Sequence, residues 1–350
     1  MCNIAGYLGE KQAAPILLEM LRRQQPYDGD MTTGIATIHE GKLYYRKMVG
    51  DVDAFLREVD LAELPGTVGI AHTRPGGKPG GPAPHPTVNK AETIAMVTNG
   101  TSPQTPYWVS RWDAAADRLV ESGYEFRGVY PNPKGRSPKL SRSGEIVHMN
   151  ECKVALVELY MSQGKSMTEA MALSQTDIYN DNVSVFLNEK FPDSIFAIRN
   201  TRPMNVIMEN GETYMATTRY GFPEELKNEP VMLPVQYACE ITRTGVKISG
   251  GRMNIEPVME MTPYTYAEAY KRFEQILRSE KAPVFFDDLE HAVGKEMRDL
   301  WPGNHTFVQH ARLVYDMLWQ FDLEGRLKRE MRIQDSHDGP RHRWYFWLED

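Results

Sequence analysis

The chain opens with MCNIAGYLG (residues 1–9), a short apolar run that follows a cysteine directly and ends at a glycine. Removal of Met1 would give Cys2 a thiol and a free α-amino group on the same residue. An α-amino group ordinarily has a pKa of about 7.7 to 8.0, so it can accept the thiol proton directly or through a bridging water. Cys2 is therefore a candidate nucleophile. The alternative is a small buried hydrophobic residue, the commoner role of a single cysteine.

Length and composition indicate a globular protein with a large domain and a smaller one. The chain has 350 residues, of which 41% are hydrophobic and 25% charged. It contains no apolar run long enough to span a membrane and no pattern of a signal peptide. The net charge of −7 gives no general attraction to nucleic acid or to anionic lipid.

The three cysteines, Cys2, Cys152 and Cys239, are odd in number, far apart and without a CxxC pair. This usage argues against a disulfide framework and against a zinc site. A reducing, cytoplasmic location is expected.

A strand pattern near residue 70 leads into a loop rich in glycine and proline. In TVGIAHTRPGGKPGGPAPHP (residues 67–86), the buried-strand pattern of residues 68–71 precedes His72, Thr73 and Arg74. An arginine on such a loop can clamp a carboxylate with two parallel hydrogen bonds. The alternative is an ordinary surface arginine on a turn.

A second apolar run, residues 91–97, ends in Thr98-Asn99-Gly100. Asn-Gly after a strand is usually a tight turn. An asparagine amide and a neighbouring glycine N–H are also two donors suited to an oxyanion.

These features together resemble a known family. The N-terminal MCNIAGYLG, the string GIAHTR (residues 69–74), His85-Pro86 and Asn99-Gly100 occur in the order and approximate spacing of the class-II glutamine amidotransferases. These enzymes are N-terminal-nucleophile hydrolases, and the closest resemblance is to the glutaminase domain of glucosamine-fructose-6-phosphate aminotransferase. The resemblance covers about residues 2–250. It implies an α+β fold, a four-layer αββα sandwich of two antiparallel sheets with helices outside.

The resemblance also assigns roles. Cys2 would be the nucleophile and Asn99 and Gly100 the oxyanion donors. Arg74 would bind the α-carboxylate of L-glutamine, with His72 and Thr73 beside the substrate. No metal and no organic cofactor is required by this scheme.

The family holds the substrate α-ammonium with an acidic residue that opens a helix. Glu151 is the candidate here and Asn150 the alternative, because residues 151–161 have a helical pattern. An acidic residue in a first helical turn is also favoured by the helix dipole alone.

The chain departs from the family at three places. Residues 25–28 read Gln-Pro-Tyr-Asp, where the family has Arg-Gly-Tyr-Asp. Residues 75–78 read Pro-Gly-Gly-Lys, where the family has a threonine and a histidine near the substrate. Residues 127–147 look like a basic, loop-like insertion. The nucleophile, the oxyanion donors and the clamp remain, so the class of reaction is better supported than the identity of the substrate.

Helices are expected over residues 12–25, 51–63 and 166–175, and strands over residues 34–38 and 43–46. The segments 183–186, 194–199, 204–208 and 213–218 are expected to form strands of a second sheet. Strands over 231–239 and 245–248 close the first domain, residues 1–250, and Gly250-Gly251 is expected to be a linker.

The second domain, residues 260–350, is expected to be small and winged-helix-like. Its pattern predicts helices over 264–280, 287–300 and 306–321, then strands over 327–333 and 343–348 around an Asp338-Gly339 turn. Acidic residues exceed basic ones in residues 261–350 (16 against 13), so a protein contact or self-association is favoured over nucleic acid. The aromatic run at residues 344–347 should dock on the first domain or on a second copy of the chain.

The expected activity is hydrolysis of the glutamine side-chain amide to glutamate and ammonia through a Cys2 thioester. Ammonia would pass to an acceptor on a separate synthase subunit or be released. Two alternatives stay open. One is an amidohydrolase of the same fold acting on another γ-glutamyl amide. The other is a non-catalytic glutamine sensor that signals through the second domain.

Overall fold

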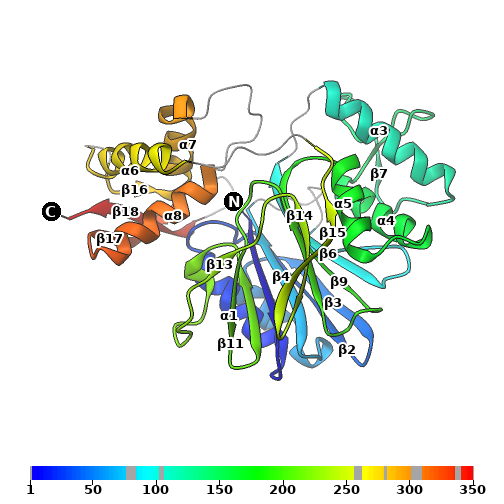
Figure 1. Cartoon of the computed structure of the whole chain (residues 1–350), viewed down its shortest axis with the longest axis horizontal. Coiled ribbons are helices and arrows are strands. Elements are labelled where there is room, and N and C mark those ends of the chain that lie inside the picture. Colours follow the sequence, from blue (N-terminus) through cyan, green and yellow to red (C-terminus); the bar gives the residue numbers. More distant parts are fainter. Residues whose placement is uncertain are drawn as a thin grey trace.

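The computed structural model describes residues 2–75, 84–101, 106–255, 262–279, 282–300, 310–335 and 340–349. Its larger part contains two antiparallel sheets (Figure 1). The first sheet has the strand order β13-β11-β12-β1-β4-β2-β3. Its strands are β1 (Asn3–Leu8), β2 (Thr32–His39), β3 (Lys42–Val49), β4 (Val68–Arg74), β11 (Asn205–Glu209), β12 (Glu212–Ala216) and β13 (Val231–Met232).

The second sheet has the strand order β15-β14-β10-β9-β6-β5. Its strands are β5 (Thr87–Val88), β6 (Ile94–Thr101), β9 (Asp181–Asn188), β10 (Ile195–Arg199), β14 (Tyr237–Thr242) and β15 (Gly245–Arg252).

Alternating side chains along the strands build three layers of apolar packing. Ile4 and Leu8 of β1 meet Val97 of β6 in the core between the two sheets. Ala5 and Tyr7 point the other way, toward α1 (Ala13–Gln24) and α2 (Val52–Glu58). The outer face of the second sheet packs against α4 (Met149–Ser162) and α5 (Met167–Asp177). The side-chain period of two explains this division, and the four layers agree with the predicted αββα arrangement.

Three predictions about the second half of this domain are wrong. The single strand expected over residues 231–239 is divided into β13 in the first sheet and β14 in the second. Of the four strands expected in a second sheet, β9 and β10 join the second sheet, whereas β11 and β12 join the first, next to β1. Gly250-Gly251 is part of β15 rather than a linker. A Cβ on Gly251 would lie 2.3 Å from the Thr168 carbonyl oxygen, so the absence of a side chain lets β15 approach α5 closely.

The remaining elements include a helix that the sequence pattern did not predict, α3 (Pro106–Glu121). The helix expected over residues 51–63 is divided into α2 and a 3-10 turn, η1 (Leu61–Glu63). The insertion at 127–147 is mostly turns, with a ribbon of two short strands, β7 (Val129–Tyr130) and β8 (Ile146–Val147).

The C-terminal part has its own core and a three-stranded sheet of order β16-β18-β17. The expected helices and hairpin are confirmed, while the short strand β16 was not predicted. The Asp338-Gly339 turn and the expected start of the third helix lie outside the described residues. The elements are α6 (Pro263–Leu277), β16 (Val284–Phe285), α7 (Phe286–Glu296), η3 (Arg298–Leu300), α8 (His310–Leu323), β17 (Leu327–Gln334) and β18 (Arg341–Leu348).

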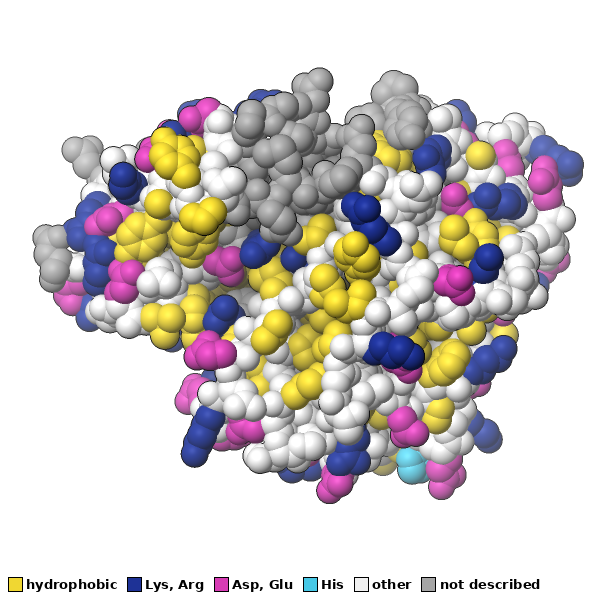
Figure 2. All heavy atoms as spheres, viewed as in Figure 1, with side chains coloured by type: hydrophobic (Ala, Val, Ile, Leu, Met, Phe, Trp, Pro, Cys, Tyr) yellow, Lys and Arg dark blue, Asp and Glu magenta, His cyan; other side chains and the backbone are white. Residues whose placement is uncertain are grey.

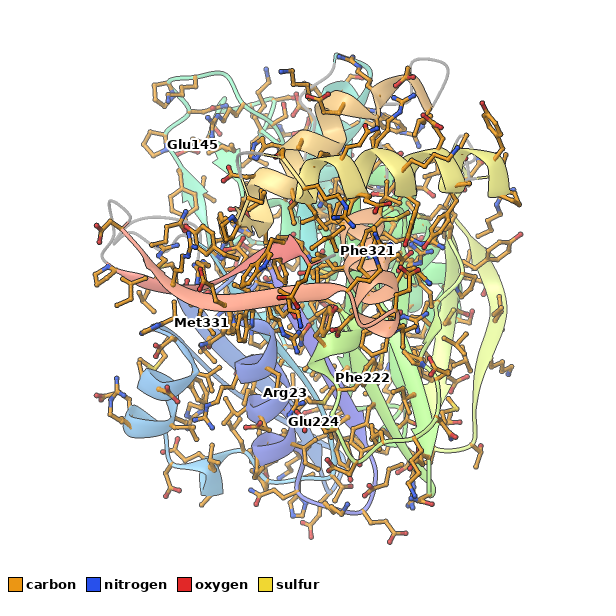
Figure 3. The ribbon with its side chains drawn as sticks, turned by 90° about the vertical axis from the view of Figure 1, so that its left-hand side faces the viewer. Arg23, Glu145, Phe222, Glu224, Phe321 and Met331 are labelled. Atoms are coloured by element: carbon orange, nitrogen blue, oxygen red, sulfur yellow. The ribbon has the colours of Figure 1, made fainter. Side chains whose placement is uncertain are left out.

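The C-terminal hairpin docks on the first domain, which confirms one of the two sites predicted for it (Figure 3). The Trp344 N–H donates to the Pro26 carbonyl at 2.9 Å. Arg343, 2% exposed, makes two hydrogen bonds of 2.8 Å to the Asp30 carboxylate. Tyr27 lies within the apolar core of the C-terminal part and stacks on Phe346. The loop at residues 26–30 thus joins the two domains.

Within the described residues, no helix has the length and apolar character needed to cross a bilayer. The same part of the chain contains no cluster of three or more His, Cys, Asp or Glu suited to a metal ion. Cys2, Cys152 and Cys239 are all free thiols.

Candidate active site

Cys2 lies at the start of β1, in the middle of the first sheet. β1 pairs with β12 on one side and with β4 on the other, where Asn3 is opposite Thr73 and Ile4 opposite His72. The antiparallel register therefore brings the end of β4 beside Cys2. Cys2 itself is only partly buried.

The second sheet reaches Cys2 through the end of β6. The Asn99 side-chain amide donates to the Cys2 carbonyl oxygen at 2.8 Å. One residue earlier, the Thr98 carbonyl oxygen is 3.0 Å from His72 Nε2, which must carry the proton for this hydrogen bond. These two bonds join the sheets where the predicted nucleophile, oxyanion donor and GIAHTR string meet.

Gly100 occupies a position without room for a side chain. Its Cβ would lie 2.0 Å from the Asp181 carbonyl oxygen on the neighbouring strand β9. On the other side of β6, β5 pairs only with Ala95 and Met96. Within the described residues the Gly100 end of β6 therefore has a strand partner on one side alone, which leaves that edge free of ladder hydrogen bonds.

Charged groups around Cys2 oppose the effect of burial on the pKa of its thiol. Burial raises the pKa of the Cys2 thiol, while the positive charges of the N-terminal amine, Arg74 and Arg202 lower it. Arg74 ends β4, and its Nε is buried with no partner in the described part of the chain. A cation near the thiol favours the thiolate, and a partly exposed guanidinium with an unused buried donor can bind an anion.

Three imidazoles adjoin Arg74, of which His72 and His85 are buried and His148 is half-buried. The rings of His72 and His85 are 4.2 Å apart. Burial first, and then the charge of Arg74, lowers the pKa of His72 to about 3 and that of His148 to about 4. Burial likewise holds the pKa of His85 well below its ordinary value. All three are neutral at pH 7, so they offer hydrogen bonds to a ligand without adding positive charge.

Thr73 holds the nucleophile strand rather than facing an open site. Its hydroxyl oxygen accepts a hydrogen bond of 3.3 Å from Asn3, the residue after Cys2. The same Asn3 amide also donates to the Asp28 carbonyl oxygen. Because Asn3 is fully buried, these bonds connect β1 with β4 and with the interdomain loop.

Glu151 and its alternative, Asn150, point to different surroundings. The Glu151 carboxylate accepts from the backbone N–H groups of Arg127 and Gly128, at 2.7 and 3.2 Å, and from the Tyr124 hydroxyl. Asn150 instead lies 3.3 Å from His85 Nε2, in the cluster that adjoins Arg74. The structure therefore brings Asn150, rather than Glu151, toward the other candidate residues.

Sequence reasoning missed Arg202 and its partners. Arg202 makes ion pairs of 3.0 Å with Asp181 and with Glu290, a residue of α7 in the C-terminal domain. It follows β10 in a loop without a recognisable motif, and Glu290 is 88 positions further on. The one usable signal was the arginine in NTRP (residues 200–203), directly after an apolar strand. The second domain thus contacts the surroundings of Cys2.

This arrangement combines the elements of acyl transfer. It has a thiol near two guanidinium groups, an asparagine amide within hydrogen-bonding distance of the same residue, and a partly buried arginine able to bind a carboxylate.

The comparisons with known proteins give relatives over part of the chain, although no protein-family model matches it. A glutamine–fructose-6-phosphate aminotransferase of Caldanaerobacter subterraneus is 32% identical over 219 residues, which are 62% of this chain and 31% of the relative. The enzyme of the same name from Methanothermobacter thermautotrophicus is 30% identical over 220 residues, 62% of this chain and 33% of the relative. The chain spans about a third of the length of these curated relatives.

Solved structures agree on the fold. A glutamine phosphoribosylpyrophosphate amidotransferase from B. subtilis, complexed with ADP and GMP, superposes with a TM-score of 0.57 at 14% identity, covering 98% of this chain and 71% of that one. A structure described as the allosteric regulatory enzyme of purine biosynthesis gives a TM-score of 0.58 at 14% identity, with 99% and 71% covered. The resemblance of the chain to class-II glutamine amidotransferases is confirmed.

Proposed function

From this resemblance to the class-II glutamine amidotransferases, we propose that the first domain hydrolyses the side-chain amide of L-glutamine, with Cys2 as the N-terminal nucleophile. The observation that supports this most is the 2.8 Å hydrogen bond from Asn99 to Cys2. Burial raises the pKa of the Cys2 thiol, and the charges of Arg74 and Arg202 partly offset that rise. The hydrogen bond joins the candidate nucleophile and the candidate oxyanion donor, which are 97 positions apart in the sequence.

The reaction has two steps. The Cys2 α-amine, freed by loss of Met1, takes the thiol proton, and the sulfur attacks the amide carbon. Asn99 and the Gly100 N–H hold the oxyanion, and the amine returns its proton as the C–N bond breaks and ammonia leaves. Water then attacks the thioester, which releases glutamate and restores the thiol.

Substrate recognition rests on Arg74, with the neutral imidazole of His72 and the amide of Asn150 beside it. Arg74 pairs with the α-carboxylate in a bidentate contact. Glu151 is a weaker candidate for the α-ammonium than the sequence suggested, because two backbone N–H groups and a hydroxyl already occupy its carboxylate. The ammonia acceptor would be handled by a separate partner.

A second substrate class is favoured by the surroundings of Arg74. The charge of Arg74 acts on three neutral imidazoles, those of His72, His85 and His148, and the amide of Asn150 lies beside His85. A γ-glutamyl amide with an uncharged, acylated α-nitrogen would suit such a wall better than a free α-ammonium. Parallel assays of glutamine and N-acetylglutamine separate the two substrates by their kcat/KM ratio.

For residues 262–349 we propose a winged-helix-like module used for docking rather than for nucleic acid. The order α6, β16, α7, α8, β17, β18 and the sheet order β16-β18-β17 support the first point. On the face drawn in Figure 2, acidic and basic side chains of this part are interspersed. A gel shift with duplex DNA that weakens steeply between about 50 and 200 mM salt would contradict the docking role.

The central test is mass spectrometry of the purified protein before and after treatment with a glutamine-like diazoketone. The expected protein begins at Cys2, gains one adduct on that residue and loses glutaminase activity in parallel. A Cys239→Ser variant should be modified identically, because Cys239 is buried in the second sheet. Full activity in protein whose mass retains Met1 would contradict the amine as general base.

A further inference from the structure

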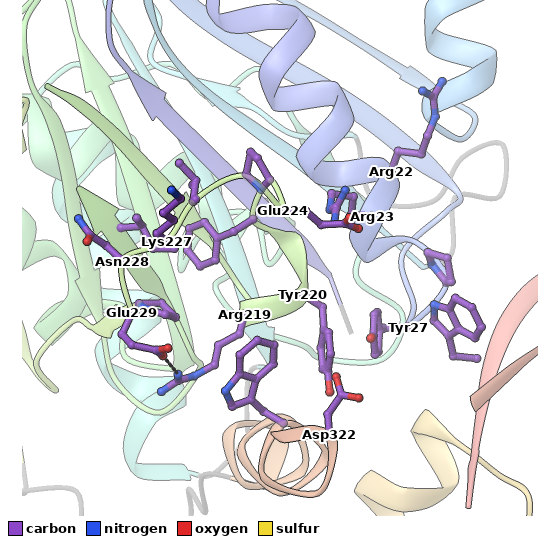
Figure 4. Close-up of a pocket in the computed structure, with 18 of the residues that line it drawn as sticks. Arg22, Arg23, Tyr27, Arg219, Tyr220, Glu224, Lys227, Asn228, Glu229 and Asp322 are labelled. Carbon is purple, nitrogen blue, oxygen red and sulfur yellow. Dashed lines mark hydrogen bonds and ion pairs between the residues drawn. The ribbon is translucent and has the colours of Figure 1, made fainter. Parts of the chain in front are cut away.

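A cavity that Cys2 does not line lies where the two domains meet (Figure 4). Its volume is about 620 Å³, within the usual size range of small-molecule sites. One wall comes from the end of α1, the Tyr27 loop and the segment 219–230, which starts with the 3-10 turn η2 (Arg219–Gly221). The opposite wall comes from α8, β17 and β18 of the C-terminal domain.

Aromatic rings line the boundary between these two walls. Tyr27 and Tyr220 stack with ring centres 5.1 Å apart, and Trp319 meets Tyr220 edge-on at 5.3 Å. The Arg329 guanidinium lies over the rings of both Tyr220, at 5.2 Å, and Trp344, at 5.3 Å. Flat groups already pack face to face here, so a further planar ring would find rings and guanidinium faces as neighbours.

The lining is also cationic. Its five cations, Arg22, Arg23, Arg219, Lys227 and Arg329, face three carboxylates, Glu224, Glu229 and Asp322. Two of the carboxylates are already paired, Glu224 with Arg23 at 2.6 Å and Glu229 with Arg219 at 3.1 Å. No described carboxylate forms an ion pair with Lys227. Arg329 donates to the Tyr27 hydroxyl at 3.2 Å and interacts with the charge of Asp322, so Lys227 is the cation whose charge is most available to a ligand.

Three hydrogen-bond donors of the lining are buried without a hydrogen-bond partner in the described part of the chain. They are the indole N–H of Trp319, the Nε of Arg23 and the hydroxyl of Tyr220. Buried donors are nearly always paired, because an unpaired one has lost its water without a replacement. Acceptor oxygens of a bound molecule would supply the missing partners.

We propose that this cavity binds a small organic anion that carries a planar aromatic ring. The ring packs against the Tyr220–Trp319 side, and the anionic group meets Lys227 and Arg329. The anion is either a phosphate ester, as in a nucleoside monophosphate, or a carboxylate, as in a hydroxybenzoate. This site is separate from the proposed glutaminase chemistry and does not depend on it.

Calorimetric titration of the full chain with chosen probes tests this. AMP, GMP and 4-hydroxybenzoate combine a ring with an anion, whereas inorganic phosphate and adenosine each carry only one of the two features. At least one ring-bearing anion should bind more tightly than about 1 mM and about tenfold more tightly than phosphate or adenosine. The better class of ring-bearing anion identifies the anionic group.

Variants locate the binding. Lys227→Gln, on the exposed rim, should weaken binding about tenfold without disturbing the fold. Trp319→Leu should weaken it about two- to tenfold. Lys247→Gln, an equally exposed lysine on β15 outside the cavity, is the matched control and should change nothing. The proposal is overturned if no ring-bearing anion binds, if phosphate binds as tightly as AMP, or if Lys227→Gln binds like the control.

Discussion

The strand that carries Cys2 is held in two different ways on its two sides. Toward β4 and β6 the contacts are strand pairing and single hydrogen bonds between neighbouring strand ends, such as that of Asn99. Toward the C-terminal domain the contacts are made by the 26–30 loop. Asn3 donates to the Asp28 carbonyl oxygen, and Arg343 donates two hydrogen bonds to the Asp30 carboxylate. The first side provides the proposed chemistry, and the second ties that chemistry to a distant part of the chain.

Cys2→Ala is the substitution expected to lower activity most. The proposed mechanism loses its nucleophile, so kcat should fall by at least about 10⁴-fold. The measurement is ammonia release from glutamine, with the unfolding curve as a check on folding. Cys152→Ala serves as the control, since Cys152 packs between α3 and α4 far from β1. Residual activity close to that of the parent would exclude Cys2 as the nucleophile.

Asn99→Ala weakens the same side without removing the nucleophile. An oxyanion donor acts mainly in the transition state, so kcat should drop about 10²- to 10³-fold with little change in KM. Arg74→Lys should mainly raise KM, because it loses a bidentate contact made in both ground and transition states. If steady-state kinetics show both variants altering KM alone, the role proposed for Asn99 is wrong.

Arg343→Ala removes the hydrogen bonds that join the C-terminal hairpin to the 26–30 loop. Removing the buried guanidinium leaves Asp30 only its longer ion pair with Arg341, at 3.7 Å, which should lower the free energy of unfolding by about 2 to 3 kcal/mol. The loosened loop should also reduce kcat about 2- to 30-fold through Asp28 and Asn3. Urea unfolding and glutaminase assays measure the two effects.

Arg332→Ala is the matched control on the same hairpin. Its exposed pair with Glu330 should contribute less than about 1 kcal/mol. Exchanging the charges, Asp30→Arg with Arg343→Asp, should recover part of the loss. Unchanged kcat in a folded Arg343→Ala protein would show that the two sides of the strand are independent.

The smallest effect is expected from acid. The unfolded chain protonates His72 near pH 6.5, whereas the folded chain keeps it neutral down to a pKa of about 3. Stability conferred by the neutral imidazole is therefore complete above pH 6.5 and is lost as the pH falls, at up to about 1.4 kcal/mol per unit. His72→Gln should make the loss of unfolding free energy between pH 7 and 5 about 2 kcal/mol smaller. Equal losses in both proteins would refute this, and urea unfolding at the two pH values decides.

The same division explains what the sequence could predict. Cys2, Arg74, Asn99 and Gly100 stand at ends of apolar strands, where the period of two and the local motif fix their position. The sheet membership of β11 and β12 could not be predicted, because their alternating pattern fits either sheet equally well.

Side-chain direction was also beyond the sequence. Glu151 turns to the backbone N–H groups of Arg127 and Gly128, which belong to the insertion that precedes it and have no place in a strand or helix ladder. Arg202 and Glu290 form a pair only after two domains have docked. Neither the direction of the Glu151 side chain nor the pairing of Arg202 with Glu290 is determined by residues close to them in the sequence.

Tyr27 has a consequence for the order in which the molecule is made. It leaves the ribosome with the first helix, yet it belongs to the C-terminal core, and its partner Arg329 follows 302 positions later. At a synthesis rate of roughly 5 to 20 residues per second, about 15 to 60 s pass between the synthesis of Tyr27 and that of Arg329. The nascent first domain must therefore expose this aromatic side chain until the C-terminal domain has been made, and the loop beside Cys2 reaches its final form only after β18 has been synthesised.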